Sequence, residues 1–145
     1  MRIYLACTVR GDRDAVAGLC ALAAALDAAG HLVLTKHLLE PTVEVDESTL
    51  TERQVYERDV AWLESCDLLI AEASGSSFGV GFEVGYVLGR ADRTDQRVLL
   101  LYRADRRNAI SRLIAGNAHP RCTVLTYENP EDLVLRVSKS LEPRA

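Results

Sequence analysis

The amino-acid sequence predicts an α/β fold in which helices cover both faces of a parallel sheet. Five short apolar runs alternate with helix-like segments along the chain, and no internal repeat or low-complexity segment interrupts them. Strands that alternate with helices pair in parallel, because each helix returns the chain to the same end of the sheet. A chain of 145 residues can bury roughly 68–70% of its unfolded surface without a disulfide or metal. We therefore expect one domain over residues 1–145, a doubly wound five-stranded parallel sheet flanked by helices, Rossmann- or flavodoxin-like.

The individual elements follow from apolar runs and from the signals at helix ends. Gly30 can end the first helix, Thr49 and Glu52 fit a capping box that opens the second, and Asn129 with Pro130 can start the last. The expected strands are residues 2–7, 31–35, 67–72, 97–102 and 121–126. The expected helices are residues 14–29, 49–65, 79–91, 108–116 and 129–141, with a loop over residues 38–48.

Composition excludes several classes of function. The formal net charge is −4 and nearly all the positive charge is arginine, which argues against a nucleic-acid surface. No apolar stretch approaches the length that a membrane helix needs, and no basic segment precedes a long apolar run. The four cysteines lack a CxxC pair and the three histidines lack metal-ligand spacing. We therefore expect a cytoplasmic protein without a metal or an organic cofactor, and without nucleic-acid or membrane partners.

The glycine-containing segment after the third strand is the most informative part of the chain. The run Leu68–Ala71 is followed by a small-residue turn and then by Gly79, Gly81 and Glu83, an order typical of strand, loop and helix start. Such a turn directs backbone N–H groups and a positive helix end at an anion, for which phosphate is the usual example. It lacks the third glycine of a dinucleotide fingerprint and belongs to the third βα unit rather than the first. The segment predicts a phosphate site beside a carboxylate.

Two carboxylates lie on apolar helix faces. Asp59 is four residues from both Val55 and Leu63, so helical spacing places it in the middle of an apolar stripe. It is either a core acid satisfied by an arginine or backbone donors, or a functional group. Glu83 also faces inward, and we expect it in the first helical turn, where the helix dipole stabilises an anion. The hypothesis is that Glu83 stays ionised as a nucleophile while Asp59 more readily holds a proton.

Other polar residues at the carboxyl ends of the expected strands are weaker candidates. Arg10 and Gly11 follow the first strand, where a solvated turn is the plainer interpretation. Ser77 can donate to a phosphate, although loop serines usually form turns. Tyr4 and Ser111 have ordinary core and surface interpretations, and His37 has at most a minor contact role.

Several short motifs follow one another in fixed order along nearly the whole chain. They are Tyr4-Leu-Ala-Cys-Thr-Val-Arg10-Gly11, Thr35-Lys-His37, Glu57-Arg-Asp59-Val-Ala-Trp62-Leu63, Ala71-Glu72, Ser77-Phe-Gly79-Val-Gly81-Phe-Glu83-Val-Gly85 and Ser111-Arg-Leu-Ile-Ala-Gly116. Together these motifs resemble the nucleoside 2-deoxyribosyltransferase superfamily, and most closely its 2′-deoxynucleoside 5′-monophosphate N-glycosidase branch, the Rcl-type hydrolases. Cys7-Thr8 departs from the glycine and serine that the family often has there. Residues 39–49 show no match, and this loop is a candidate for deciding base preference.

The resemblance implies a role for each matching residue. Glu83 corresponds to the nucleophile that forms a glycosyl-enzyme, Asp59 to the acid beside the leaving base, and Tyr4 to the tyrosine that orients the nucleophile. Two further sets are implied: a phosphate and sugar pocket of Arg10, Gly11, Ser77, Gly79 and Ser111, and weaker base contacts from Val9 and His37. Ser111 would enter the neighbouring subunit's phosphate pocket, which implies a homodimer with shared sites.

The activity that this implies is hydrolysis of the N-glycosidic bond of a (2′-deoxy)nucleoside 5′-monophosphate to free base and (deoxy)ribose 5-phosphate. A carboxylate beside the reacting carbon stabilises an oxocarbenium-like transition state and can trap the sugar, and a second carboxyl can protonate the base. Three alternatives stay open. They are a nucleoside 2-deoxyribosyltransferase, a ribonucleotide hydrolase of the CMP-cleaving type, and a non-catalytic nucleotide-binding module.

Overall fold

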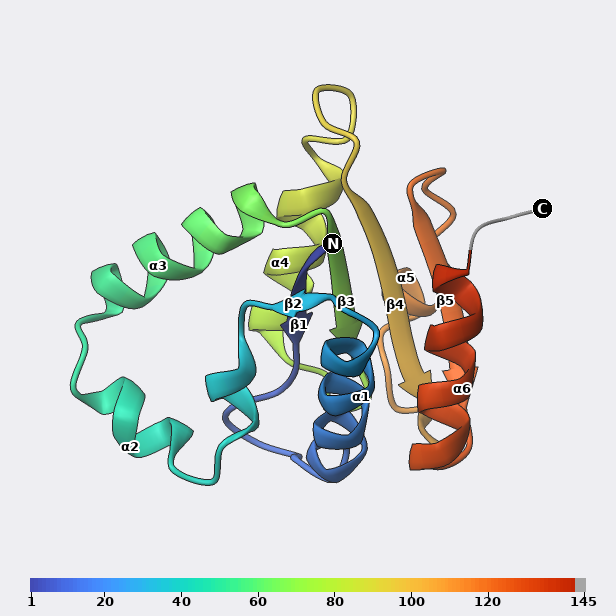
Figure 1. The fold of residues 1–145 in the computed structure, drawn as a ribbon, viewed down its shortest axis with the longest axis horizontal. Coiled ribbons are helices and arrows are strands. Elements are labelled where there is room, and N and C mark those ends of the chain that lie inside the picture. The colour runs from blue at the N-terminus through green and yellow to red at the C-terminus, as the bar shows by residue number, and fades with distance from the viewer. Residues whose placement is uncertain (143–145) are drawn as a thin grey trace.

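The computed structural model describes residues 1–142 as a five-stranded parallel sheet with helices on both faces (Figure 1). The strand order is β2-β1-β3-β4-β5 and every neighbouring pair is parallel. The predicted α/β class and five-stranded doubly wound sheet are therefore confirmed. The strands are β1 (Arg2–Ala6), β2 (Leu32–Val33), β3 (Leu68–Glu72), β4 (Arg97–Arg103) and β5 (Cys122–Tyr127). The helices are α1 (Val16–Ala28), η1 (Lys36–Leu39), α2 (Val43–Ser48), α3 (Glu52–Ser65), α4 (Phe78–Leu88), η2 (Ala104–Arg106), α5 (Arg112–Ala115) and α6 (Pro130–Leu141).

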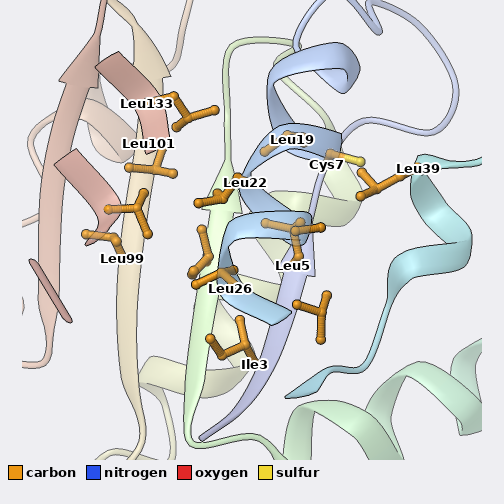
Figure 2. Close-up of a cluster of buried hydrophobic side chains, with 14 of the residues drawn as sticks. Ile3, Leu5, Cys7, Leu19, Leu22, Leu26, Leu39, Leu99, Leu101 and Leu133 are labelled. Atoms are coloured by element: carbon orange, nitrogen blue, oxygen red, sulfur yellow. The ribbon is translucent and has the colours of Figure 1, made fainter. Parts of the chain in front are cut away.

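Alternation along the strands builds two separate cores. Ile3 and Leu5 of β1 face α1 and α6, and Figure 2 shows them packed with Leu22 and Leu26 of α1. The intervening residues point to the opposite face, toward α3 and α4. They include Tyr4, Ala6, Leu69, Ala71 and Leu100, which pack with Leu63, Val80, Val84 and Val87. The period of two therefore places Tyr4 of β1 under α4, where the candidate nucleophile lies.

The second strand is shorter than expected because the side chain of Thr35, rather than its backbone, forms the hydrogen bonds to β1. Thr35 is fully buried, and its hydroxyl accepts a hydrogen bond from Leu5 N at 2.9 Å and donates one to Leu5 O at 2.7 Å. The predicted strand over residues 31–35 thus ends at Val33, and the chain turns into η1. The strand propensity of residues 31–35 does not reveal that the Thr35 hydroxyl takes the place of backbone hydrogen bonds between the strands.

Three predictions about the helices were wrong. Residues 38–48 are not a plain loop, because they contain the end of η1 and the whole of α2. The capping box of α3 uses Thr51 and Gln54 rather than Thr49 and Glu52. Ser111, not Asn108, is the N-cap position of α5. The start of α6 is confirmed, since Asn129 accepts from Asp132 N at 2.9 Å and Pro130 follows it.

No helix among residues 1–142 has both the length and the apolar composition needed to cross a lipid bilayer.

Candidate active site

A cleft of about 510 Å³ opens at the carboxyl ends of β1 and β3. Its walls come from the segment after β1, from the α2–α3 region and from the first turns of α4. Ligands of open parallel sheets bind outside the carboxyl ends of the strands, so this is the expected place. Six of the residues singled out from the sequence line it, namely Val9, Arg10, Asp59, Ser77, Gly79 and Glu83.

Glu83 is held from below by Tyr4. The Tyr4 hydroxyl donates a hydrogen bond of 2.5 Å to Glu83 Oε1, and Tyr4 itself is fully buried in the sheet. A short hydrogen bond to a carboxylate fixes the orientation of the acceptor and stabilises its charge. One oxygen of Glu83 is thus anchored while its carboxyl group lines the cleft.

The prediction that Glu83 lies in the first turn of its helix, where the helix dipole would keep it ionised, was wrong. The helix begins at Phe78, so Glu83 lies beyond the first turn, which contains no acidic residue. The helix dipole falls off within that turn and gives this carboxyl little help. Burial instead raises the Glu83 pKa from 4.5 to about 7, although the Tyr4 hydrogen bond acts in the opposite direction. The free cleft therefore holds a carboxyl that is partly protonated near neutral pH.

Asp59 on α3 lines the same cleft and is paired with an arginine. Arg58 Nε donates to Asp59 Oδ1 at 2.8 Å, and Arg58 Nη2 donates to Glu47 Oε1 at the same distance. The guanidinium also lies over the Trp62 ring, 5.2 Å from its centroid. This is the arginine pairing that the sequence left open as one interpretation of Asp59, and its role as the proton holder stays a prediction.

The opposite end of the cleft is built to accept an anion. Ser77 is the N-cap of α4 and its oxygen accepts from Val80 N at 3.5 Å, which leaves the hydroxyl hydrogen available to a ligand. Gly79 lies in the first turn, where backbone N–H groups have no intrahelical partner. Arg10 lines this cleft and forms no ion pair with any residue from 1 to 142. A helix N-terminus beside an uncommitted guanidinium suits a phosphate.

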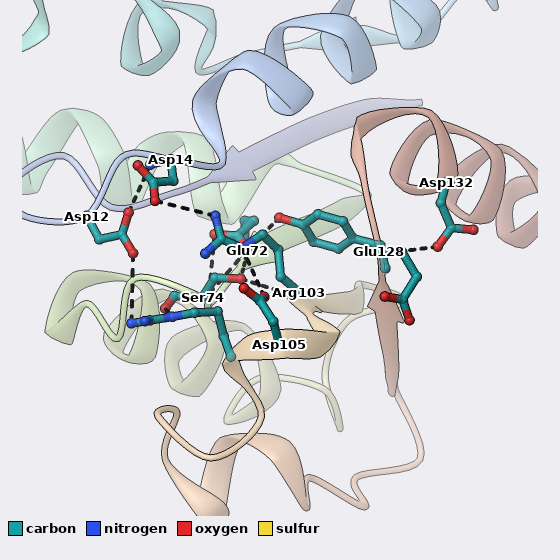
Figure 3. A network of polar contacts seen from close by, with 10 residues as sticks. Asp12, Asp14, Glu72, Ser74, Arg103, Asp105, Glu128 and Asp132 are labelled. Carbon is teal, nitrogen blue, oxygen red and sulfur yellow. Dashed lines mark hydrogen bonds and ion pairs between the residues drawn. The ribbon is translucent and has the colours of Figure 1, made fainter.

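A buried polar network fixes the loop that leads to this helix (Figure 3). Glu72, only 2% exposed, accepts from the Ser74 hydroxyl, from Ser74 N at 3.2 Å and from the Tyr127 hydroxyl at 3.0 Å. The Ser74 oxygen in turn accepts from Arg103 N at 2.8 Å. Burial raises the pKa of Glu72 and these donors oppose the shift. The network ties the ends of β3, β4 and β5 together behind the Ser74–Ser77 turn.

Gly75 in that turn packs directly on the segment after β1. A Cβ atom at Gly75 would lie 2.2 Å from Thr8 Oγ1 and 2.9 Å from the backbone oxygen of Asp12. Only glycine allows this approach of the two segments, which form the anion end of the cleft.

Four of the predicted site residues do not line this cleft, namely Tyr4, which lies beneath Glu83, and Gly11, His37 and Ser111. Gly11 lies in the turn beyond Arg10 with φ of +125°, a conformation that glycine adopts readily. His37 packs against Trp62, with ring centroids 5.3 Å apart, and burial lowers its pKa. Ser111 lines a separate apolar hollow of about 460 Å³ beside α4 and α5. The hollow shares Ser77 with the cleft, so the two adjoin at the start of α4.

The individual residues of the outer wall of the cleft were not singled out from the sequence, although the segment 39–49 was named as a candidate for deciding base preference. Glu47 and Ser48 of α2, the turn residue Leu50, and Glu52 and Val55 of α3 all line it. Val55 belongs to the apolar stripe read from helical spacing, but nothing in the pattern of residues 39–49 indicated that α2 covers the cleft. The acids of this segment carry no spacing signal, because their position depends on how the chain folds back from η1.

Comparison with known proteins identifies the family. Residues 3–134 match the nucleoside 2-deoxyribosyltransferase family. The chain belongs to this family. The resemblance seen in the sequence motifs is therefore confirmed.

Individual relatives and a solved structure show which members of the family this chain is similar to. A protein of Thermofilum pendens with the provisional name 2′-deoxynucleoside 5′-phosphate N-hydrolase 1 is 36% identical over 141 residues, which cover 97% of this chain and 95% of that protein. The 5-hydroxymethyl-dUMP N-hydrolase of Danio rerio is 32% identical, with 90% of each chain covered. Among solved structures, a CMP N-glycosidase of Clostridium botulinum superposes with a TM-score of 0.73 over 97% of this chain and 100% of that one, at 17% identity. The similarity to the CMP N-glycosidase structure shows that the two proteins share a fold.

Proposed function

We propose that this member of the nucleoside 2-deoxyribosyltransferase family hydrolyses the N-glycosidic bond of (2′-deoxy)nucleoside 5′-monophosphates, giving free base and (deoxy)ribose 5-phosphate. The observation that carries the proposal is the Glu83 carboxyl, anchored by Tyr4 in a cleft with an anion site at one end. The names of the relatives from Thermofilum and Danio support the same bond and the same phosphorylated substrate class.

The 5′-phosphate occupies the end formed by Arg10, Ser77 and the first turn of α4. Their charge and donors match a phosphate and leave the sugar to extend toward Glu83. This end also separates the hydrolase from a transferase, because an unphosphorylated nucleoside gains nothing from an arginine and a helix N-terminus.

Glu83 acts as the nucleophile. Its ionised oxygen attacks C1′ as the bond to the base breaks, and the glycosyl-enzyme ester that forms is later hydrolysed by water. Burial raises the Glu83 pKa to about 7, so near neutral pH many protein molecules carry a protonated Glu83. In these molecules Glu83 must lose its proton before it can attack. Asp59 lines the same cleft and serves as the group that takes up a proton and passes it to the leaving base.

We further propose that the functional unit is a homodimer. Ser111 lies in the apolar hollow beside α4 rather than in the Glu83 cleft. Phe78 lines this hollow and is 99% exposed, and Leu113 of the adjoining α5 is 84% exposed, so large apolar side chains lie open to solvent here. A second copy that covers this face can bring its Ser111 to the neighbouring phosphate end, since the hollow and the cleft meet at Ser77.

We place the enzyme in the cytoplasm. The four cysteines are all free in the structure, as expected for a reducing compartment.

A direct test incubates the protein with deoxynucleoside monophosphates and with the matching unphosphorylated nucleosides, each with and without an acceptor base. We expect release of free base from the monophosphates alone, independent of acceptor, as measured by chromatography. Glu83→Gln should lower turnover at least about a thousandfold while monophosphate binding stays measurable by calorimetry. Glu131→Gln, an exposed acid on α6, is the matched control. Base exchange without net hydrolysis would identify a transferase, and near-normal turnover of Glu83→Gln would exclude the covalent route.

A further inference from the structure

The wall of the cleft away from Ser77 is formed by the end of η1, by α2 and by the start of α3. It combines the apolar side chains of Leu38, Leu50 and Val55 with the half-buried carboxylate of Glu47 and with the exposed Ser48 and Glu52. Apolar walls with a small number of well-placed polar groups are typical of sites that orient a ligand. This composition differs from that of the Ser77 end and suits the base of a nucleotide rather than its phosphate.

Glu47 is held in a fixed position on this wall. Arg58 Nη2 donates to Glu47 Oε1 at 2.8 Å, and the two side chains are only 22% and 16% exposed, Arg58 and Glu47 respectively. Arg58 is itself fixed by Asp59 and by the Trp62 ring. The second oxygen of Glu47 accepts no hydrogen bond from residues 1–142. Glu47 therefore presents an acceptor in the cleft without the cost of ordering a mobile side chain.

The same arginine places Glu47 on the side of the leaving group. Arg58 bridges Glu47 and Asp59, so both carboxylates lie at one end of the cleft. The proposed function assigns the base to the Asp59 side of Glu83 and the phosphate to Ser77. A carboxylate beside the phosphate would repel it, whereas one beside the base can recognise it.

We infer that Glu47 reads the leaving base and selects bases that carry an exocyclic amino group, an inference that rests on the proposed function. Cytosine and adenine present N–H₂ donors, and a carboxylate is the side chain that accepts from cytosine N4. Guanine also offers N–H donors. Uracil and thymine have a ring N3–H donor but no exocyclic amino group. They place a carbonyl oxygen at the position of the cytosine amino group, and a carboxylate opposite that oxygen is repulsive.

The test compares Glu47→Gln with Glu44→Gln, an exposed acid on the same helix that does not line the cleft. kcat/KM is measured for the 2′-deoxy monophosphates of cytidine, adenosine, guanosine, uridine, thymidine and 5-hydroxymethyluridine. We expect the unmodified protein to favour the amino-bearing bases by about tenfold or more, as a hydrogen bond to a charged group allows. Glu47→Gln keeps an oxygen for Arg58 and turns an amide N–H₂ toward the base, so the preference should fall below about threefold or reverse. Glu44→Gln should leave it unchanged.

A binding titration of the same panel keeps the inference independent of turnover. The monophosphates are titrated by calorimetry into Glu83→Gln and into the double variant Glu83→Gln/Glu47→Gln. If no monophosphate is cleaved, the proposed function is wrong, and the titration still decides whether Glu47 sets base preference. A preference of the unmodified protein for uracil-type bases, or a preference that Glu47→Gln leaves intact in both assays, overturns the inference.

Discussion

The Tyr4 hydroxyl donates a 2.5 Å hydrogen bond to Glu83 Oε1, joining the interior strand β1 to α4 at the base of the cleft. It is the only hydrogen bond that the Glu83 side chain makes among residues 1–142. Tyr4 is fully buried, so its ring cannot move without disturbing the sheet. The rigid strand therefore sets the orientation of the proposed nucleophile.

Tyr4→Phe should keep the fold and lower kcat by about ten- to hundredfold, because a nucleophile that loses its positioning contact departs from the reactive geometry. The hydroxyl also lowers the Glu83 pKa, so its removal should move the pH–rate profile to higher pH. KM for the monophosphate should change little, since Tyr4 does not line the cleft. Steady-state kinetics across pH measures all three. Tyr56→Phe, whose side chain is 55% exposed on α3, is the control, and an unshifted profile in Tyr4→Phe would contradict the positioning role.

The Glu83 carboxyl should make both activity and stability depend on pH. Its pKa is raised from 4.5 to about 7 by burial, so the folded state binds this proton more tightly than the unfolded chain. The stabilisation from this group is complete below about pH 4.5 and is lost as the pH rises through about 7, by roughly 3 kcal/mol. Activity should change in the opposite sense and rise through about pH 7 as the nucleophile ionises.

Urea unfolding of the unmodified protein and of Glu83→Gln at pH 5 and pH 8 measures this contribution. The variant cannot ionise, so its free energy of unfolding should fall less between the two pH values. Identical pH dependence in the two proteins would show that Glu83 titrates at its ordinary value.

Mixing two defective variants should restore activity if Ser111 serves the neighbouring site. Ser111→Ala retains Glu83 and should show a raised KM, whereas Glu83→Gln retains Ser111 and should not turn over. A mixed dimer contains one site in which both side chains are native. That site should show the KM of the unmodified protein, and the other site should be inactive. Kinetics of the mixture at several ratios provides the measurement. A KM that stays at the Ser111→Ala value at every ratio would place Ser111 in its own chain's site or outside any site.

Tyr127→Phe should destabilise the fold by about 1–3 kcal/mol, since it removes a hydrogen bond to the buried Glu72 carboxyl. The lost donor leaves the network behind the Ser74–Ser77 turn incomplete, so KM for monophosphates should also rise. Thermal unfolding and kinetics report the two effects. Tyr102→Phe is a suitable control, because Tyr102 is also buried but its hydroxyl makes no hydrogen bond within residues 1–142. Equal stability of the two variants would argue against an energetic role for the network.

Much of the fold was predictable because it depends on periodicity and end signals. The alternation of apolar runs with helices gave the class, and Asn129-Pro130 gave the start of α6. The failures occurred where a tertiary contact overrides the local pattern. Thr35 ends β2 by bonding both backbone groups of Leu5, and α2 forms in a segment whose sequence shows no strong helical periodicity.

The site was predictable in part for a similar reason. Asp59 and Glu83 stood out as acids on apolar faces, and both line the cleft. Their charge environment did not follow from spacing, because Arg58 is adjacent to Asp59 in sequence and its choice of partner depends on Glu47 from α2. Glu83 was expected in the first turn of its helix, whereas it is the sixth residue of α4, although the predicted start of that helix was only one residue away from the observed one.

The contact of Gly75 with Thr8 and Asp12 has a consequence for how this protein can diverge. With 2.2 Å between a Cβ at Gly75 and Thr8 Oγ1, no larger residue is tolerated unless the first crossover loop is remodelled at the same time. Substitutions in these two loops should therefore be inherited together, and grafting either loop alone into a relative should fail where grafting the pair succeeds.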